Sequence, residues 1–163
     1  MEATALRGLT AQLGNATLVA GTTTTLSLSV ATAFAISGKV YSKAIASNQA
    51  TPTTDANTGA AFLGVKANKG CVFVLGLDAS GNTVAVQGEI TDLDASGNFV
   101  IAPEFPATIP ATMCPIGYYI IKAGATADAT TGWILGTSNV ASVTGITYTL
   151  VNIATLPTRP QIA

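Results

Sequence analysis

Residues 22–38 are TTTTLSLSVATAFAISG, and this stretch decides the fold class. Its large apolar side chains occupy alternate positions: Leu26, Leu28, Val30, Phe34 and Ile36. Alternation with a period of two is typical of a β-strand with one buried face. Serine and alanine fill the positions between, so a second layer can approach the other face closely. We predict that this strand ends near Gly38 and that residues 39–45, KVYSKAI, begin the next one.

Further short runs of apolar and β-branched residues recur along the chain. They are FLGVKA (62–67), CVFVLGL (71–77), TVAVQGEI (83–90), FVIAPEF (99–105), YYIIKA (118–123), GWILGT (132–137) and VTGITYTLVNIATL (143–156). We expect a strand in each, and the last one carries apolar residues at both parities, which predicts burial on both faces. The sequence therefore predicts an all-β protein, an antiparallel sandwich or jelly-roll-like barrel of about 8–10 short strands with extended termini.

The word DASGN occurs twice, at residues 78–82 and 94–98. An aspartate opens each copy, and a glycine stands where a hairpin turn needs a positive φ. An EF-type calcium loop is the alternative interpretation, but it requires several carboxylates and each copy supplies one. We predict two turns of a β-meander.

Three other segments lack strand periodicity. Residues 46–59, ASNQATPTTDANTG, have the composition of a loop. Residues 103–115, PEFPATIPATMCP, contain four prolines and should form an extended surface connection, because proline donates no hydrogen bond to a central strand. Residues 157–163 form a proline-containing tail.

The N-terminal segment, residues 1–21, is open to two interpretations. Leu6, Leu9 and Leu13 would form one apolar stripe on a short helix, whereas an extended arm on a neighbouring chain fits equally well. The expected organisation is an N-terminal arm or short helix over 1–21, a β domain over 22–156 and an extended tail over 157–163.

Charge is scarce. Charged residues are 9% of the 163 residues, against about 25% in typical soluble domains. Alanine (28) and threonine (25) make up about a third of the chain, and the net charge is −1. The seven cations are scattered, so we expect no nucleic-acid binding, and no apolar stretch reaches the length of a membrane-spanning helix. Charge depletion is typical of surfaces buried in an assembly, and we predict a homo-oligomer.

The residues that carry catalysis are few. There is no histidine, which excludes the usual Ser/His/Asp and Cys/His arrangements. Glu89, Asp92 and Asp94 lie close in sequence and raise a glycosidase or calcium hypothesis, but one tryptophan and four tyrosines offer little to line a sugar cleft. We expect no enzyme, no cofactor and no metal site. Cys71 and Cys114 are interpreted as two buried thiols, with a bridge between them as the alternative.

Several stretches together resemble small virion structural proteins of tailed bacteriophages. They are AFAISGKVYSKA (33–44), ATPTTDANTGAAF (50–62), GCVFVLGLDASGN (70–82), the FPATIP and CPIGYYIIKAG runs (105–110 and 114–124), and TLPTRPQ (155–161). The resemblance spans most of residues 34–161 and is greatest to capsid cement, or decoration, proteins.

The resemblance implies a protein that binds the outside of a capsid shell and stabilises it. The implied location is the virion, assembled in the host cytoplasm, and the implied partner is the major capsid protein. A homotrimer would match three-fold sites on a shell, and a dimer at two-folds is the alternative. The competing function is a tail- or fibre-associated structural or receptor-binding module, which would need an exposed aromatic or polar groove.

Overall fold

The computed structural model describes residues 8–161, and this part of the chain is all-β, as predicted. Its strands are β1 (Ala11–Gln12), β2 (Thr17–Ala20), β3 (Thr25–Val30), β4 (Thr32–Ile36), β5 (Lys39–Lys43), β6 (Ala46–Ala50), β7 (Lys69–Asp78), β8 (Thr83–Gln87), β9 (Thr91–Asp92), β10 (Met113–Ala123) and β11 (Ile146–Asn152). No helix occurs between residues 8 and 161. None is therefore present there that could cross a membrane.

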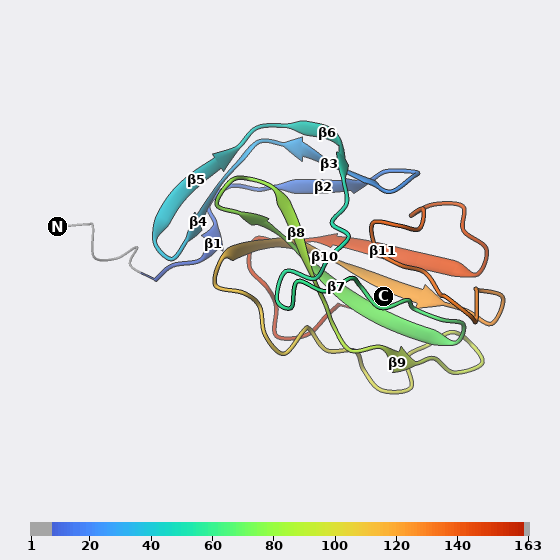
Figure 1. The fold of residues 1–163 in the computed structure, drawn as a ribbon. Coiled ribbons are helices and arrows are strands. Elements are labelled where there is room, and N and C mark those ends of the chain that lie inside the picture. The colour runs from blue at the N-terminus through green and yellow to red at the C-terminus, as the bar shows by residue number, and fades with distance from the viewer. Residues whose placement is uncertain (1–7, 162–163) are drawn as a thin grey trace.

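The first layer of the sandwich is a meander of three bent passes of the chain. Its two halves have the orders β1-β4-β5 and β2-β3-β6, and each pass contributes one strand to each half (Figure 1). The strand predicted over residues 26–36 corresponds to the second of the three passes, which consists of β3 and β4 and is interrupted at Ala31. A two-residue turn at Ser37 and Gly38 leads into β5, as predicted, and both residues have positive φ.

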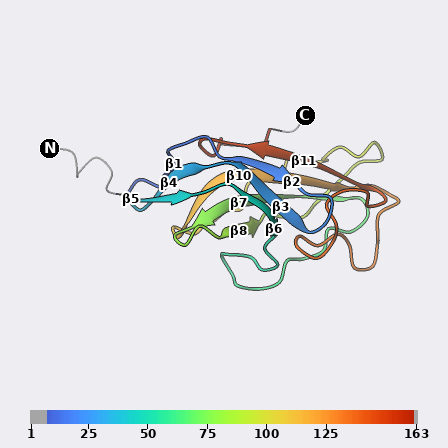
Figure 2. The same cartoon turned by 90° about the horizontal axis from the view of Figure 1, so that it is seen from above.

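The second layer is a sheet of order β11-β10-β7-β8. Its centre is the long antiparallel pair β7 and β10, in which Met113 pairs with Asp78 and Ala123 pairs with Lys69. The short strand β9 continues β8 along the same edge of β7. Viewed from above, β1 to β6 lie over β7, β8 and β10, so the molecule is a sandwich rather than a closed barrel (Figure 2).

The core between the layers contains the side chains that the alternating pattern predicted. Leu26, Leu28, Phe34 and Ile36 are buried there, against β7 residues of one parity such as Phe73. Val30, by contrast, is 44% exposed. It directly precedes the interruption at Ala31, where the pass bends and the alternation no longer directs its side chain into the core.

The opposite face of β7 and β10 is also buried. Val72, Tyr118 and Ile120 on this face pack with Phe105 and Leu156, which come from the proline-rich connection and the C-terminal segment. The predicted surface connection therefore also serves as a cover. Pro115 does not belong to it, because β10 begins at Met113; a register shift between Pro115 and Gly117 accommodates the proline in this central strand.

The expectation of an N-terminal arm or short helix is wrong for residues 11–12 and 17–20, which form β1 and β2 of the chain's own first layer. Side-chain amides tie this edge to the second sheet. Asn152 donates to the Leu18 carbonyl at 3.1 Å and accepts from the Leu18 amide at 2.6 Å, and Gln12 donates to the Ile153 carbonyl at 3.2 Å. Leu6 lies outside the described residues.

The C-terminal tail also packs on its own chain. Pro160 is buried, and the backbone amide of Gln161 donates to the Tyr118 hydroxyl at 2.9 Å. Residues 157–161 have no secondary structure, as predicted, but they do not extend away from the domain.

Several predicted boundaries are corrected. Residues 46–50, predicted as loop, form the edge strand β6, because β3 supplies a pairing partner. Residues 62–67, 99–105 and 132–137, predicted as strands, make only single bridges such as Val65 with Trp133. The strand β11 is not buried on both faces; it lies at the sheet edge, and one side of it faces solvent.

Candidate interaction surface

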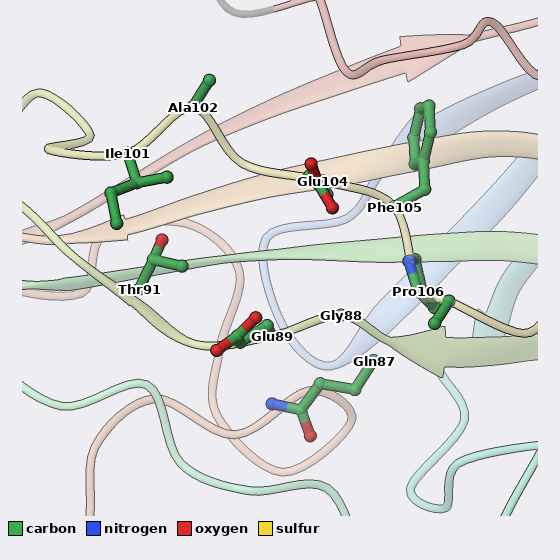
Figure 3. Close-up of a pocket in the computed structure, with 10 residues that line it drawn as sticks. Gln87, Gly88, Glu89, Thr91, Ile101, Ala102, Glu104, Phe105 and Pro106 are labelled. Carbon is green, nitrogen blue, oxygen red and sulfur yellow. The ribbon is translucent and has the colours of Figure 1, made fainter.

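A groove lies where β8 gives way to β9. Gln87 pairs with Phe73 whereas Thr91 pairs with Gly70, so the edge strand has one more residue than β7 over this interval. Such a β-bulge bends the edge outward and leaves local backbone unpaired. The bulge and the proline-rich connection run along opposite sides of the groove, which has a volume of about 430 Å³ (Figure 3).

A second hollow of about 480 Å³ adjoins the groove and shares the bulge residues with it. Its other wall is the loop after β6, including Ala61 and Leu63. Gln87 ties this loop to the bulge, since its side-chain amide accepts from the Leu63 backbone amide at 2.8 Å and donates to the Leu63 carbonyl at 2.9 Å. The groove and the second hollow share the bulge residues as a common wall, and we call the two together the bulge groove.

Asp55 holds the same loop against β8 and is buried to all but 8% of its surface. One carboxylate oxygen accepts the backbone amides of Asn57 and Thr58, both at 2.9 Å, and the Thr58 hydroxyl at 3.3 Å. The other oxygen accepts a hydrogen bond from the backbone amide of Gln87 at 2.7 Å. The carboxylate thus closes its own turn and also clips that turn to the sheet edge.

We expect Asp55→Ala to lower the free energy of unfolding by about 2–3 kcal/mol, because three backbone amides lose a charged acceptor in partly buried hydrogen bonds. Limited proteolysis should also become faster between residues 56 and 64. Asp78→Ala is the matched control: the Asp78 carboxylate accepts only amides of its own exposed turn, and its loss should cost about 1 kcal/mol. Equal losses of unfolding free energy for the two variants in urea would contradict the role of Asp55 in holding the loop against β8.

The rim of the bulge groove is apolar and acidic. Leu63 and Ile101, which line it, are 68% and 70% exposed, which is high for large aliphatic side chains. Glu89 and Glu104 are also exposed and lie on opposite sides of the groove (Figure 3). Exposed aliphatic side chains gathered around a depression are typical of a protein–protein contact surface.

The three acidic residues singled out in the sequence are separated in the structure. Glu89 lines the bulge groove, Asp92 forms an ion pair with Lys69, and Asp94 serves its own turn. Within residues 8–161 no group of three or more His, Cys, Asp or Glu side chains is placed to hold a metal ion. The arrangement of two carboxylates across a sugar cleft is therefore not found with these three residues.

Both DASGN words are turns, as predicted, and Gly81 and Gly97 each have a φ of +77°. The first joins β7 to β8. The second closes a single bridge between Leu93 and Phe99, so it is a turn without a full hairpin. Backbone amides that donate hydrogen bonds to the Asp94 carboxylate, chiefly the amide of Asn98, lower the pKa of this group.

The two cysteines are free and buried, and the alternative of a bridge is wrong. Cys71 pairs with Ile121 and Cys114 pairs with Leu77, so they lie at opposite ends of the β7–β10 ladder. Six residues of strand separate these ends by roughly 20 Å. A disulfide needs α-carbons within about 7 Å of one another.

Burial raises the pKa of Cys71 from 9.0 to about 12 and that of Cys114 to about 11. Below pH 9 the thiols are protonated in both the folded and the unfolded chain. Between pH 9 and 11 the unfolded thiols ionise first, so the free energy of unfolding should fall with pH by up to about 1.4 kcal/mol per unit and thiol. Urea unfolding from pH 7 to 10 should show this fall, and the variant Cys71→Ala/Cys114→Ala should show a shallower one. Equal slopes of unfolding free energy against pH would contradict the attribution of this fall to the two buried thiols.

Trp133 is buried in the core. Its ring meets Phe73 edge to face at 5.9 Å, and its indole nitrogen donates to the Asn139 carbonyl at 2.8 Å. It is therefore not available for stacking on a ligand.

Sequence reasoning did not find the bulge groove. Asp55 was visible only as a loop residue, and Gln87 and Glu104 carried no motif. The one available signal was Gly88 inside an apolar run, since a glycine within a strand often marks a bulge.

Comparisons of the chain with models of protein families, with curated proteins and with solved structures found no match.

Proposed function

We propose that this chain is a structural protein of the virion of a tailed bacteriophage, and that it binds the outside of the capsid shell and stabilises it. The observation that carries the proposal is the bulge groove. A chain with only 15 charged residues presents two large exposed aliphatic side chains, Ile101 and Leu63, at the two hollows beside the bulge. Surface of this kind is stable when a protein partner covers it.

The action proposed is stabilisation by binding, without a catalytic step. A protein that binds the assembled shell across subunit junctions must dissociate before the shell can rupture, so its binding free energy adds to shell stability. One interface of about 1,600 Å² suffices for a specific contact, and several contacts per oligomer strengthen it through effective concentration. We propose a homotrimer, whose symmetry fits a three-fold position, with the major capsid protein as partner.

The test is binding to expanded, DNA-free shells of the phage that encodes the chain. Purified protein should sediment with the shells up to a fixed ratio to the major capsid protein, and should raise the temperature at which the shells rupture. Absence of binding at saturating protein would overturn the proposal. Recovery with isolated tails instead of shells would replace it with the tail or fibre function.

A further inference from the structure

We propose that the bulge groove receives the β5 edge of a second copy of this chain, so that copies associate head to tail. The role of this contact in a capsid rests on the proposed function. The contact itself is measurable in solution without shells.

The acceptor side of the contact is acidic. Lys69 and Asp92 form the only ion pair between residues 8 and 161. Glu89 and Glu104 therefore have no cation from this part of the chain, although both are exposed at the groove. A partner that fits here supplies positive charge together with apolar surface for the aliphatic rim.

The β5 edge has this composition. β5 is the outermost strand of its half of the first layer, so one side of its backbone has no neighbouring strand. Lys39 and Lys43 lie on this strand, four residues apart, and Val40 and Ile45 beside them are 51% and 63% exposed. Two lysines and two aliphatic side chains complement two carboxylates and the aliphatic rim.

Other described cations are less suited to this role. Lys69 is paired with Asp92, and Lys122 lies over the Phe99 ring at 5.5 Å. Lys66 interacts electrostatically with Asp128: the pKa of the Asp128 carboxyl is lowered mainly by the backbone amide of Thr130 and in smaller part by the charge of Lys66. Lys39 also lies over a ring, that of Tyr41 at 5.4 Å, but both groups belong to the same strand. Among the described cations, Lys39 and Lys43 are the pair that shares a free strand edge.

β5 lies at one end of the first layer, whereas the bulge lies in the second sheet, between β8 and β9 (Figure 1). One copy therefore does not satisfy its own groove. A contact between different surfaces of identical copies is heterologous, and it closes into a ring when the rotation between copies allows. A three-membered ring would be the proposed trimer.

Charge reversal with rescue tests the contact. Sedimentation velocity should show the wild type above its 16.3 kDa monomer mass. Glu89→Lys/Glu104→Lys and Lys39→Glu/Lys43→Glu should each weaken self-association by at least about tenfold, because each juxtaposes like charges. Mixing the two variants in equal amounts should restore association into pairs, since the groove of each variant then meets an edge of opposite charge; a closed ring of three should not form, because two of its neighbours would be the same variant.

Thr144→Lys/Thr149→Lys, at exposed positions away from both surfaces, is the control for added charge and should associate like the wild type. A monomeric wild type, or reversed variants that associate normally, would overturn the head-to-tail contact. So would a mixture of folded variants, verified by circular dichroism, that fails to re-associate. Shell binding by the wild type is read separately, so loss of this contact leaves the capsid proposal standing, and loss of shell binding leaves this contact standing.

Discussion

Gly136→Ala should lower the free energy of unfolding by about 3–5 kcal/mol, more than any other substitution by a single methyl group proposed for this chain. Gly136 has a φ of +74°, where an L-residue is strained by about 1–2 kcal/mol. An added β-carbon would also overlap the carbonyl oxygen of Pro52 and meet the Thr51 carbonyl oxygen at 3.0 Å. Both are backbone atoms, so relief requires the loop after β6 to move away from residue 136.

Gly97→Ala is the matched control. Gly97 has nearly the same φ, +77°, but no atom lies within 4 Å of an added β-carbon. Only the backbone strain remains, and the expected loss is about 1–2 kcal/mol. Urea unfolding followed by circular dichroism measures both losses. Equal losses would show that the approach of the Pro52 backbone does not contribute.

Phe73→Ala should lower the free energy of unfolding by about 3–5 kcal/mol. The ring is fully buried at the centre of the core between the layers. It meets Phe62 and Trp133 edge to face, at 5.5 Å and 5.9 Å, so its removal leaves a cavity and breaks two aromatic contacts. Domains are typically stable by about 5–15 kcal/mol, so this variant should be close to unfolding at ambient temperature.

The comparison for Phe73 is Tyr148→Ala. Tyr148 is 38% exposed on the edge strand β11, and its truncation should cost about 1 kcal/mol or less. Thermal unfolding of both variants gives the contrast. A Phe73→Ala protein as stable as Tyr148→Ala would mean that the two layers do not pack through this ring.

The amino-acid sequence alone determined the all-β class, the meander turns and much of the core. Alternation from Leu26 to Ile36 and the two DASGN words are local signals, because strand parity and turn geometry depend on neighbouring residues. The long strands β7 and β10 were also visible, although β10 extends through Pro115. Of the candidate surface, only Gly88 gave a signal.

The tertiary structure decided which segments pair and which faces are covered. Residues 46–50 became a strand because they pair with β3, whereas residues 99–105 became a cover because Phe99 and Phe105 pack on the outer face of β7 and β10. The bulge groove exists because Gln87 and Asp55 join a distant loop to β8. Which segments pair and which cover a face depends on contacts between residues far apart in the chain. An apolar run in the sequence does not by itself distinguish a strand from a covering segment or an exposed rim. Local pattern therefore specifies the all-β class, the turns and the central strands of this protein, and only the packed fold specifies its edge strands, covers and surface.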